Sequence, residues 1–133
     1  MFQSPQVILF SPDIGRAVDF YSQLGFKETF RVRELGEPVH VDLILDGYKI
    51  GLASVDSSRE DHGLQPIPQG QRAAIALWTE DTEAAYAALR AKGVQGLRAP
   101  HEWLGRLFIA WVADPDGNPI QLVQHLRGEP SWS

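Results

Sequence analysis

The chain has no cysteine among its 133 residues. Disulfide bonds, thiolate nucleophiles and cysteine-based zinc sites are therefore excluded. Basic residues are also few, since 12 Lys and Arg stand against 17 Asp and Glu and give a formal net charge of −5. They form no run, whereas proteins that bind nucleic acid usually carry a concentrated basic surface. We therefore expect no nucleic-acid partner.

Long hydrophobic segments are missing as well. No stretch approaches the ~20 apolar residues that a membrane-spanning helix needs. Residues 1–5 do not begin the basic-then-apolar pattern of a signal peptide. We expect a cytoplasmic protein with no membrane partner. A hydrophobic content of 44% over this length suits one globular domain, residues 1–133.

The chain does contain an internal repeat. Residues 10–26 and residues 78–94 share an aromatic residue, an aspartate and a glycine in the same order and spacing. An Asp-Gly pair then recurs further along each copy. A duplicated unit places equivalent residues at equivalent points in space, so the repeat shows where to look for a site. The equivalent residues are Phe10 and Trp78, Asp13 and Asp81, Gly25 and Gly93, and Asp46-Gly47 and Asp116-Gly117.

Hydrophobic periodicity predicts a βαβββ unit in each copy. In the first we expect a strand at 6–10, a helix from Asp13 to Gly25, and strands at 27–34, 39–45 and 48–54. In the second we expect a strand at 73–79, a helix at 81–92, a short strand at 95–98, a loop at 99–105, and strands at 107–113 and 119–125. The repeats span 5–54 and 72–126, joined by a polar linker at 55–71. The tail from Leu126 to Ser133 should be frayed, with Trp132 a candidate for packing.

Two motifs resemble those of a known family. They are the run Ala-Val-Asp-Phe-Tyr-Ser-Gln-Leu-Gly-Phe ending at Phe26, and Ala-Asp-Pro-Asp-Gly-Asn-Pro-Ile-Gln-Leu-Val at 113–123. The chain resembles the vicinal oxygen chelate superfamily of glyoxalase I, extradiol dioxygenases and bleomycin resistance proteins. The resemblance implies an α+β fold in which two curled four-stranded sheets surround a cavity. It also implies a homodimer, although one duplicated chain could close the cavity by itself.

Metal-dependent members of that family use four inward-facing side chains, mostly His and Glu. The resemblance places the four positions here at Gln6, Gly51, Ala74 and Gln121. None is a good ligand for zinc, nickel, manganese or iron, and two have no ligating atom. We therefore predict no metal and no other cofactor. A relocated metal site that uses His40 and Asp42 stays open as an alternative.

Strand alternation then predicts which side chains line the cavity. Pairing across Asp46-Gly47 should set Ile44 opposite Lys49, Asp42 opposite Gly51 and His40 opposite Ala53. In the second copy we expect Arg106, Phe108 and Ala110 on the same face as Gln121. The loop before this strand adds Trp103, because aromatic side chains at the equivalent rim of bleomycin resistance proteins stack on planar drugs. The predicted ligand contacts are Gln6, Ile8, His40, Asp42, Gly51, Ala74, Trp78, Trp103, Arg106, Phe108 and Gln121.

Three functions are compatible with this inventory. The leading hypothesis is a metal-free protein that sequesters an aromatic or heterocyclic small molecule, like the bleomycin resistance proteins, without turnover. The second is a lyase, isomerase or dioxygenase of the same fold, with His40 and Asp42 as an acid–base pair and Arg106 or Lys49 as an anion clamp. The third is a regulatory homodimer with a vestigial cavity. No catalytic residue is assigned.

Overall fold

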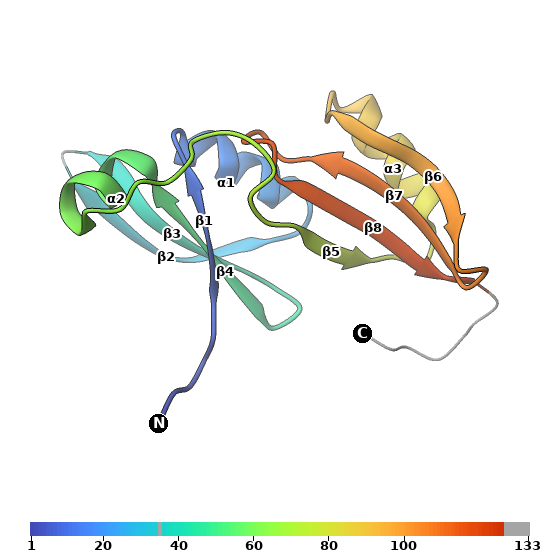
Figure 1. Cartoon of the computed structure of the whole chain (residues 1–133), viewed down its shortest axis with the longest axis horizontal. Coiled ribbons are helices and arrows are strands. Elements are labelled where there is room, and N and C mark those ends of the chain that lie inside the picture. The colour runs from blue at the N-terminus through green and yellow to red at the C-terminus, as the bar shows by residue number, and fades with distance from the viewer. Residues whose placement is uncertain (35, 127–133) are drawn as a thin grey trace. The chain divides into compact units, whose positions relative to one another are not determined.

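The structure is a computed structural model of the chain, and it describes residues 1–34 and 36–126. The tail expected to fray, with Trp132, lies almost entirely outside these residues. The chain divides into two compact units, Met1–Gly70 and Gln71–Ser133. Each unit contains one four-stranded sheet and a helix packed against it (Figure 1). The fold is α+β, as predicted.

The first unit follows the predicted βαβββ order and adds one helix. Its sheet, called the first sheet, has the strand order β1-β4-β3-β2, with β1 parallel to β4 and the other pairs antiparallel. The elements are β1 (Val7–Ser11), α1 (Ile14–Gln23), β2 (Lys27–Glu34), β3 (Glu37–Leu45), β4 (Tyr48–Ser54) and α2 (Val55–His62).

The second unit repeats this plan. Its sheet, called the second sheet, has the order β5-β8-β7-β6, with β5 parallel to β8. The elements are β5 (Ile75–Trp78), α3 (Thr82–Ala91), β6 (Gly96–Trp103), β7 (Leu107–Ala113) and β8 (Pro119–His125). Among the described residues, no helix is long and apolar enough to cross a membrane.

The duplicated aspartates begin the two equivalent helices. The side chain of Asp13 accepts a hydrogen bond from the backbone N–H of Arg16 at 3.1 Å, and Asp81 does the same for Ala84 at 3.0 Å. Such a cap satisfies one of the amides that the first helical turn leaves without a partner. The glycine after each helix has a positive φ, as a left-handed helix end requires.

One face of each sheet is covered by its helix and holds much of the core. In the first unit α1 packs on β2, β3 and β4, and Tyr21 is fully buried with edge-on contacts to Phe20 and Phe26. In the second unit α3 packs on β6, β7 and β8. The strand residues buried on the α1 side are Leu9, Val41, Leu43, Ile50 and Leu52. We call the side of each sheet opposite α1 or α3 its open face.

One local prediction was wrong, and the linker at 55–71 contains a helix that was not predicted. The linker begins with α2, whose first turn is capped by the side chain of Ser54 on the N–H of Ser57 at 2.9 Å. The expected loop at 99–105 is largely strand, because β6 continues to Trp103. Its pairing with β7 is irregular between Arg98 and His101, around a proline that has no N–H to donate.

Candidate functional site

The open face of the first sheet carries three hydrogen-bonded polar side chains. Oδ1 of Asp42 accepts a hydrogen bond from Nε2 of Gln6 at 2.8 Å and lies 2.7 Å from Nε2 of His40. The strand register is the predicted one, with Asp42 opposite Gly51 and His40 opposite Ala53. Ile8 pairs with the other side of Gly51 and therefore shares this face.

Gly51 provides the room for these side chains to meet. A Cβ atom at this position would lie 3.0 Å from Nε2 of Gln6, 3.1 Å from Cε1 of His40 and 3.3 Å from Cγ1 of Ile8. These approaches are closer than ordinary van der Waals contact between a side chain and its neighbours. A larger residue here would push these side chains apart, so glycine is favoured for packing, and its backbone φ is not in the left-handed region.

Two opposing effects act on the Asp42 carboxyl group. Burial raises its pKa, because desolvation disfavours the charged form. The hydrogen bonds from His40 and Gln6, together with attraction to His40 and Lys49, lower the pKa and outweigh that effect. The net pKa is below the ordinary value of 3.8, so Asp42 is a carboxylate at neutral pH.

Exposed apolar side chains surround this polar group. Phe30 on β2 pairs with Asp42, and Val32 pairs with His40, so both lie on the open face. Phe30 is 55% exposed, Ile8 47% and Val32 38%. Apolar surface beside a few fixed polar groups is typical of sites for organic ligands.

The open face of the second sheet is rich in aromatic side chains. The Trp78 indole stacks on the His125 imidazole, with ring centroids 4.4 Å apart and an interplanar angle of 18°. Trp78 keeps 42% of its surface exposed. Gln121 pairs with Ala76 on one side and with Trp111 on the other, which places Trp111 on the same face.

An aliphatic cluster lies beside these rings. Leu107, Ile109 and Val123 are buried together, and the partly buried Trp111 packs against them. Trp103 pairs with Leu107 at the end of β6 and is 50% exposed, so it also belongs to the open face. The face therefore combines a packed aliphatic floor with two exposed indoles.

The predicted face of Phe108 and Ala110 was wrong. Phe108 pairs with Gln124 and Ala110 with Leu122, on the side covered by α3. The amide oxygen of Gln124 accepts a hydrogen bond from the N–H of Thr82, the first residue of α3, which fixes that orientation. Arg106 lies outside both strands, between β6 and β7, so strand alternation does not apply to it.

Phe108 and Ala110 lie on the covered face because of the length of the turn before β8. Ala113 pairs with Pro119, which leaves five residues in the turn, whereas Leu45 pairs with Tyr48 across only two. The longer turn shifts the pairing of β7 with β8 by one residue relative to the pairing of β3 with β4. Trp111 therefore occupies the position equivalent to Asp42, opposite Gln121. A one-residue shift moves every side chain of a strand to the other face.

Sequence reasoning missed several open-face residues for this reason. Trp111, Ile109 and Leu107 follow from the five-residue turn once its closing pair is known, and His125 follows from its parity with Gln121. In the first sheet Phe30 and Val32 were missed as well, because the prediction did not extend the pairing from His40 and Asp42 to β2. Ala74 is exposed and lies just before β5, two residues from Ala76, which pairs with Gln121.

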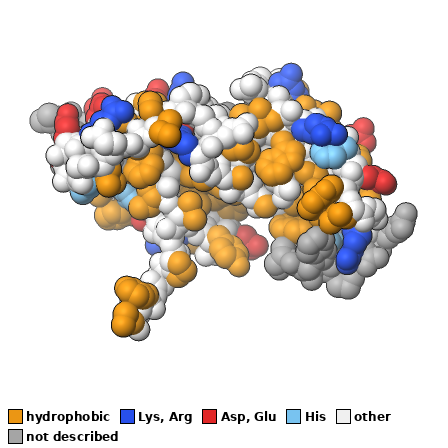
Figure 2. Space-filling view, in the orientation of Figure 1, with side chains coloured by type: hydrophobic (Ala, Val, Ile, Leu, Met, Phe, Trp, Pro, Cys, Tyr) orange, Lys and Arg blue, Asp and Glu red, His pale blue; other side chains and the backbone are white. Residues whose placement is uncertain are grey.

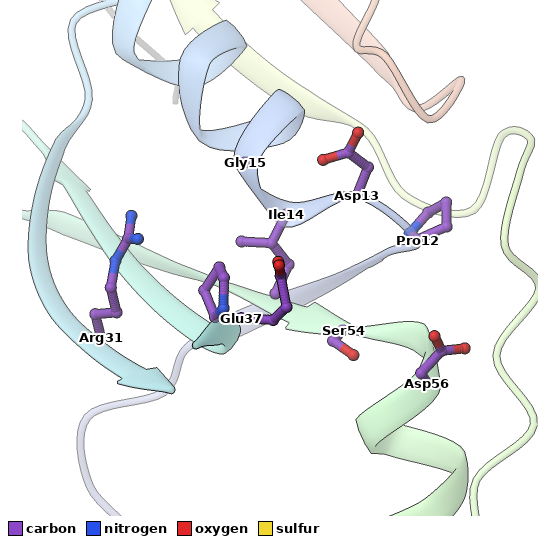
Figure 3. Close-up of a pocket in the computed structure, with 9 residues that line it drawn as sticks. Pro12, Asp13, Ile14, Gly15, Arg31, Glu37, Ser54 and Asp56 are labelled. Carbon is purple, nitrogen blue, oxygen red and sulfur yellow. The ribbon is translucent and has the colours of Figure 1, made fainter. Parts of the chain in front are cut away.

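A hollow of about 530 Å³ lies on the α1 side of the first unit. Figure 3 shows it between the start of α1, Arg31 and Glu37 on the strands, and Asp56 at the start of α2. The Arg31 guanidinium is held by Glu28 through hydrogen bonds of 2.7 and 2.8 Å, which raise its pKa. Asp13 is held by its capping bond. Arg31 and Asp13 already have partners in the fold, so the open faces remain the better candidate site.

A family model for the glyoxalase/bleomycin resistance protein/dioxygenase superfamily matches residues 3–122. The chain belongs to this superfamily. A comparison with curated proteins found no match.

Solved structures of superfamily members show the same fold. A glyoxalase/bleomycin resistance protein/dioxygenase from Nocardioides is 21% identical with a TM-score of 0.76, covering 100% of this chain and 91% of that one. A superfamily member from Sphaerobacter thermophilus is 29% identical with a TM-score of 0.72, covering 93% and 98%. A lactoylglutathione lyase from Agrobacterium tumefaciens is 15% identical with a TM-score of 0.69, covering 92% of each chain.

The metal positions of the superfamily hold residues that do not fit a divalent transition metal. Gly51 and Ala74 offer no donor atom, and the Gln6 amide nitrogen donates to Asp42. Gln121 offers only an amide, which is a weak ligand compared with imidazole or carboxylate. Within residues 1–34 and 36–126, no three His, Asp or Glu side chains come together as a metal-binding group. The metal-free state remains a prediction.

Proposed function

We propose that this protein binds a planar aromatic or heterocyclic small molecule on the open face of the second sheet, without a metal ion. The proposal corresponds to sequestration of the bleomycin-resistance type, in which the ligand is held and not converted. The observation that carries it is the half-exposed Trp78 indole, held flat against His125 at 4.4 Å.

The stack fixes the indole in place before a ligand arrives. A ring whose orientation is already set loses little side-chain entropy on binding, so more of the stacking energy appears as affinity. The buried cluster of Leu107, Ile109 and Val123 gives the face a rigid floor. Figure 2 shows hydrophobic side chains exposed on the surface of both units.

Gln121 supplies polar selectivity on this face. Its amide offers both a donor and an acceptor beside Trp111, and it is neither fully buried nor fully exposed. Such a group suits the ring nitrogens and carbonyls of a heterocycle better than a purely aliphatic ligand. Superfamily membership supports the general reading, since the family includes bleomycin resistance proteins by name.

The test is quenching of tryptophan fluorescence by a panel of flat heteroaromatic compounds that includes bleomycin. Replacing Trp78 by leucine should weaken the best ligand about tenfold, because an aromatic stack contributes ~0.5–1.5 kcal/mol beyond simple burial. Tyr48→Leu, at an exposed position that belongs to the other unit, is the control and should leave affinity unchanged. Equal affinity for Trp78→Leu and wild type would contradict the proposal.

A further inference from the structure

The hydrogen-bonded group of Gln6, His40 and Asp42 on the first sheet determines which ring nitrogen of His40 carries the proton. The Asp42 carboxylate can only accept hydrogen bonds, and its Oδ1 lies 2.7 Å from Nε2 of His40. Nε2 therefore carries the hydrogen. In the neutral ring the other nitrogen, Nδ1, must then hold a free lone pair. Gln6, which donates to the same Oδ1 at 2.8 Å, keeps the carboxylate in this orientation.

The Nδ1 lone pair has no competing partner within the described parts of the chain. The contact with Asp42 is the one hydrogen bond recorded for the ring there. The His40 side chain is 27% exposed and the Asp42 side chain 14%. The ring thus keeps access to solvent while the carboxylate behind it is more sheltered. An imidazole oriented by a carboxylate, with its second nitrogen open, is the arrangement of a general base.

The surroundings give this base an apolar platform. Val32 lies across the strand from His40, and Phe30 and Ile8 lie on the same face. All three are more than a third exposed. The charged groups near the imidazole are Asp42 on its own strand and Lys49 on β4, which also attracts Asp42. Gln6, just before β1, is neutral, and the β2 residues opposite Asp42 and His40 are apolar. The other charged residues that β2 places on this face are Lys27, opposite Ile44, and Arg33, opposite Pro38.

We infer that the open face of the first sheet is a general-base site for a flat organic substrate with a weakly acidic C–H or N–H group. The substrate lies on Ile8, Phe30 and Val32, and Nδ1 of His40 takes its proton. The electron pair of the broken bond stays on the substrate. The carboxylate of Asp42 stabilises the imidazolium, which then returns the proton to another atom of the same substrate or to water. Neither an oxidant nor a metal is required.

His40 is the catalytic residue of this site, and Asp42 and Gln6 are positioning residues. The site belongs to the first unit and does not depend on Trp78 or on the ligand proposed for the second sheet. A protein that only sequesters its ligand has no need for an oriented base. The inference therefore adds an activity to the proposed function.

The test uses 5-nitrobenzisoxazole, a flat heteroaromatic compound, as the probe. Removal of its C3 proton by a base forms the nitrile while the N–O bond breaks, which releases a coloured phenolate with no co-reactant. The wild-type protein should convert the probe faster than free imidazole does at equal concentration. His40→Gln should lower kcat/KM by about 100-fold or to background, as expected for loss of a general base. His62→Gln, on α2, is the control and should leave the rate unchanged.

A second measurement tests the orientation of the ring directly. In protein labelled with ¹⁵N-histidine, the NMR signals of His40, identified by their loss in His40→Gln, should show the Nε2–H tautomer. Asp42→Asn should mix the tautomers and lower kcat more than it changes KM, whereas a purely structural role would leave the tautomer unchanged. Thermal unfolding of each variant confirms that it is folded.

The outcomes are decisive in both directions. No acceleration by the wild type, full activity in His40→Gln, or an Nδ1–H tautomer would each overturn the inference. Fluorescence quenching at Trp78 is measured separately. Ligand binding there without reaction of the probe would reject the general base and leave the proposed function standing.

Discussion

At the scale of single residues, Asn118 ties together the turn before β8. Its backbone N–H and its side-chain amide both donate to the Asp114 carboxylate, at 2.8 and 2.9 Å, and the N–H of Asp116 donates to it as well. Asp114 is 5% exposed and Asn118 2%. This turn sets the register of β7 and β8, so its hydrogen bonds also decide which side chains reach the open face.

Replacing Asn118 by alanine should therefore reduce the free energy of unfolding by about 1–3 kcal/mol, the cost of removing one partner from a buried hydrogen-bonded group. Urea unfolding followed by tryptophan fluorescence measures the loss. The repeat supplies a matched control in Tyr48, which follows the other Asp-Gly pair and is 80% exposed. Tyr48→Ala should change stability by only about 0.5 kcal/mol. Equal losses in the two variants would contradict the role of the buried turn.

At the scale of elements, the sequence was a reliable guide where local chemistry decides the outcome. The two-residue Asp46-Gly47 turn fixes one pairing, and every predicted partner across β3 and β4 is confirmed. The aspartate caps and terminal glycines likewise fixed the two equivalent helices. These signals act within a few residues, so they can be read without knowing the fold.

The same reasoning failed where pairing depends on a longer turn. Five residues from Asp114 to Asn118 allow more than one closing pair, and side-chain hydrogen bonds that cannot be seen in the sequence select Ala113 with Pro119. The result moved Phe108 to the covered face and Trp111 to the open face. The open face of the first sheet was therefore largely predictable, whereas that of the second sheet depended on a shift of one residue in strand pairing.

The helix caps lead to a prediction at this scale. Asp13→Ala and Asp81→Ala should each reduce the free energy of unfolding by about 1 kcal/mol, because an amide of the first turn loses its partner. Asp19→Ala is the control, since Asp19 lies inside α1 and is exposed. Circular dichroism during urea unfolding measures the three variants. If the capping variants lose no more stability than the control, the two aspartates do not contribute as caps.

At the scale of the whole molecule, duplication has preserved the framework and let the two open faces diverge. Gly51 leaves space for a Gln–Asp–His group in the first unit, whereas the equivalent position, Gln121, lies beside Trp111 in the second. The fold depends on the caps, the turns, the covered faces and the buried cluster of Leu107, Ile109 and Val123. The other residues on the open faces are then free to specify chemistry, which is why superfamily membership alone does not name a ligand.

Metal content distinguishes the proposed binder from a metal-dependent relative. The four superfamily ligand positions contain two amides, a glycine and an alanine, and the nearest imidazole–carboxylate pair, His40 and Asp42, is engaged in its own hydrogen bond. Elemental analysis of purified protein should find well below one equivalent of Zn, Ni, Mn or Fe per chain. Treatment with a chelator should leave the Tm unchanged, because removing a metal that stabilises the folded state would lower it. One tightly bound metal per chain, with a lower Tm after chelation, would contradict the metal-free proposal. If that metal were lost in His40→Gln, it would place a relocated site on the first sheet, because imidazole nitrogen is the strongest donor available there.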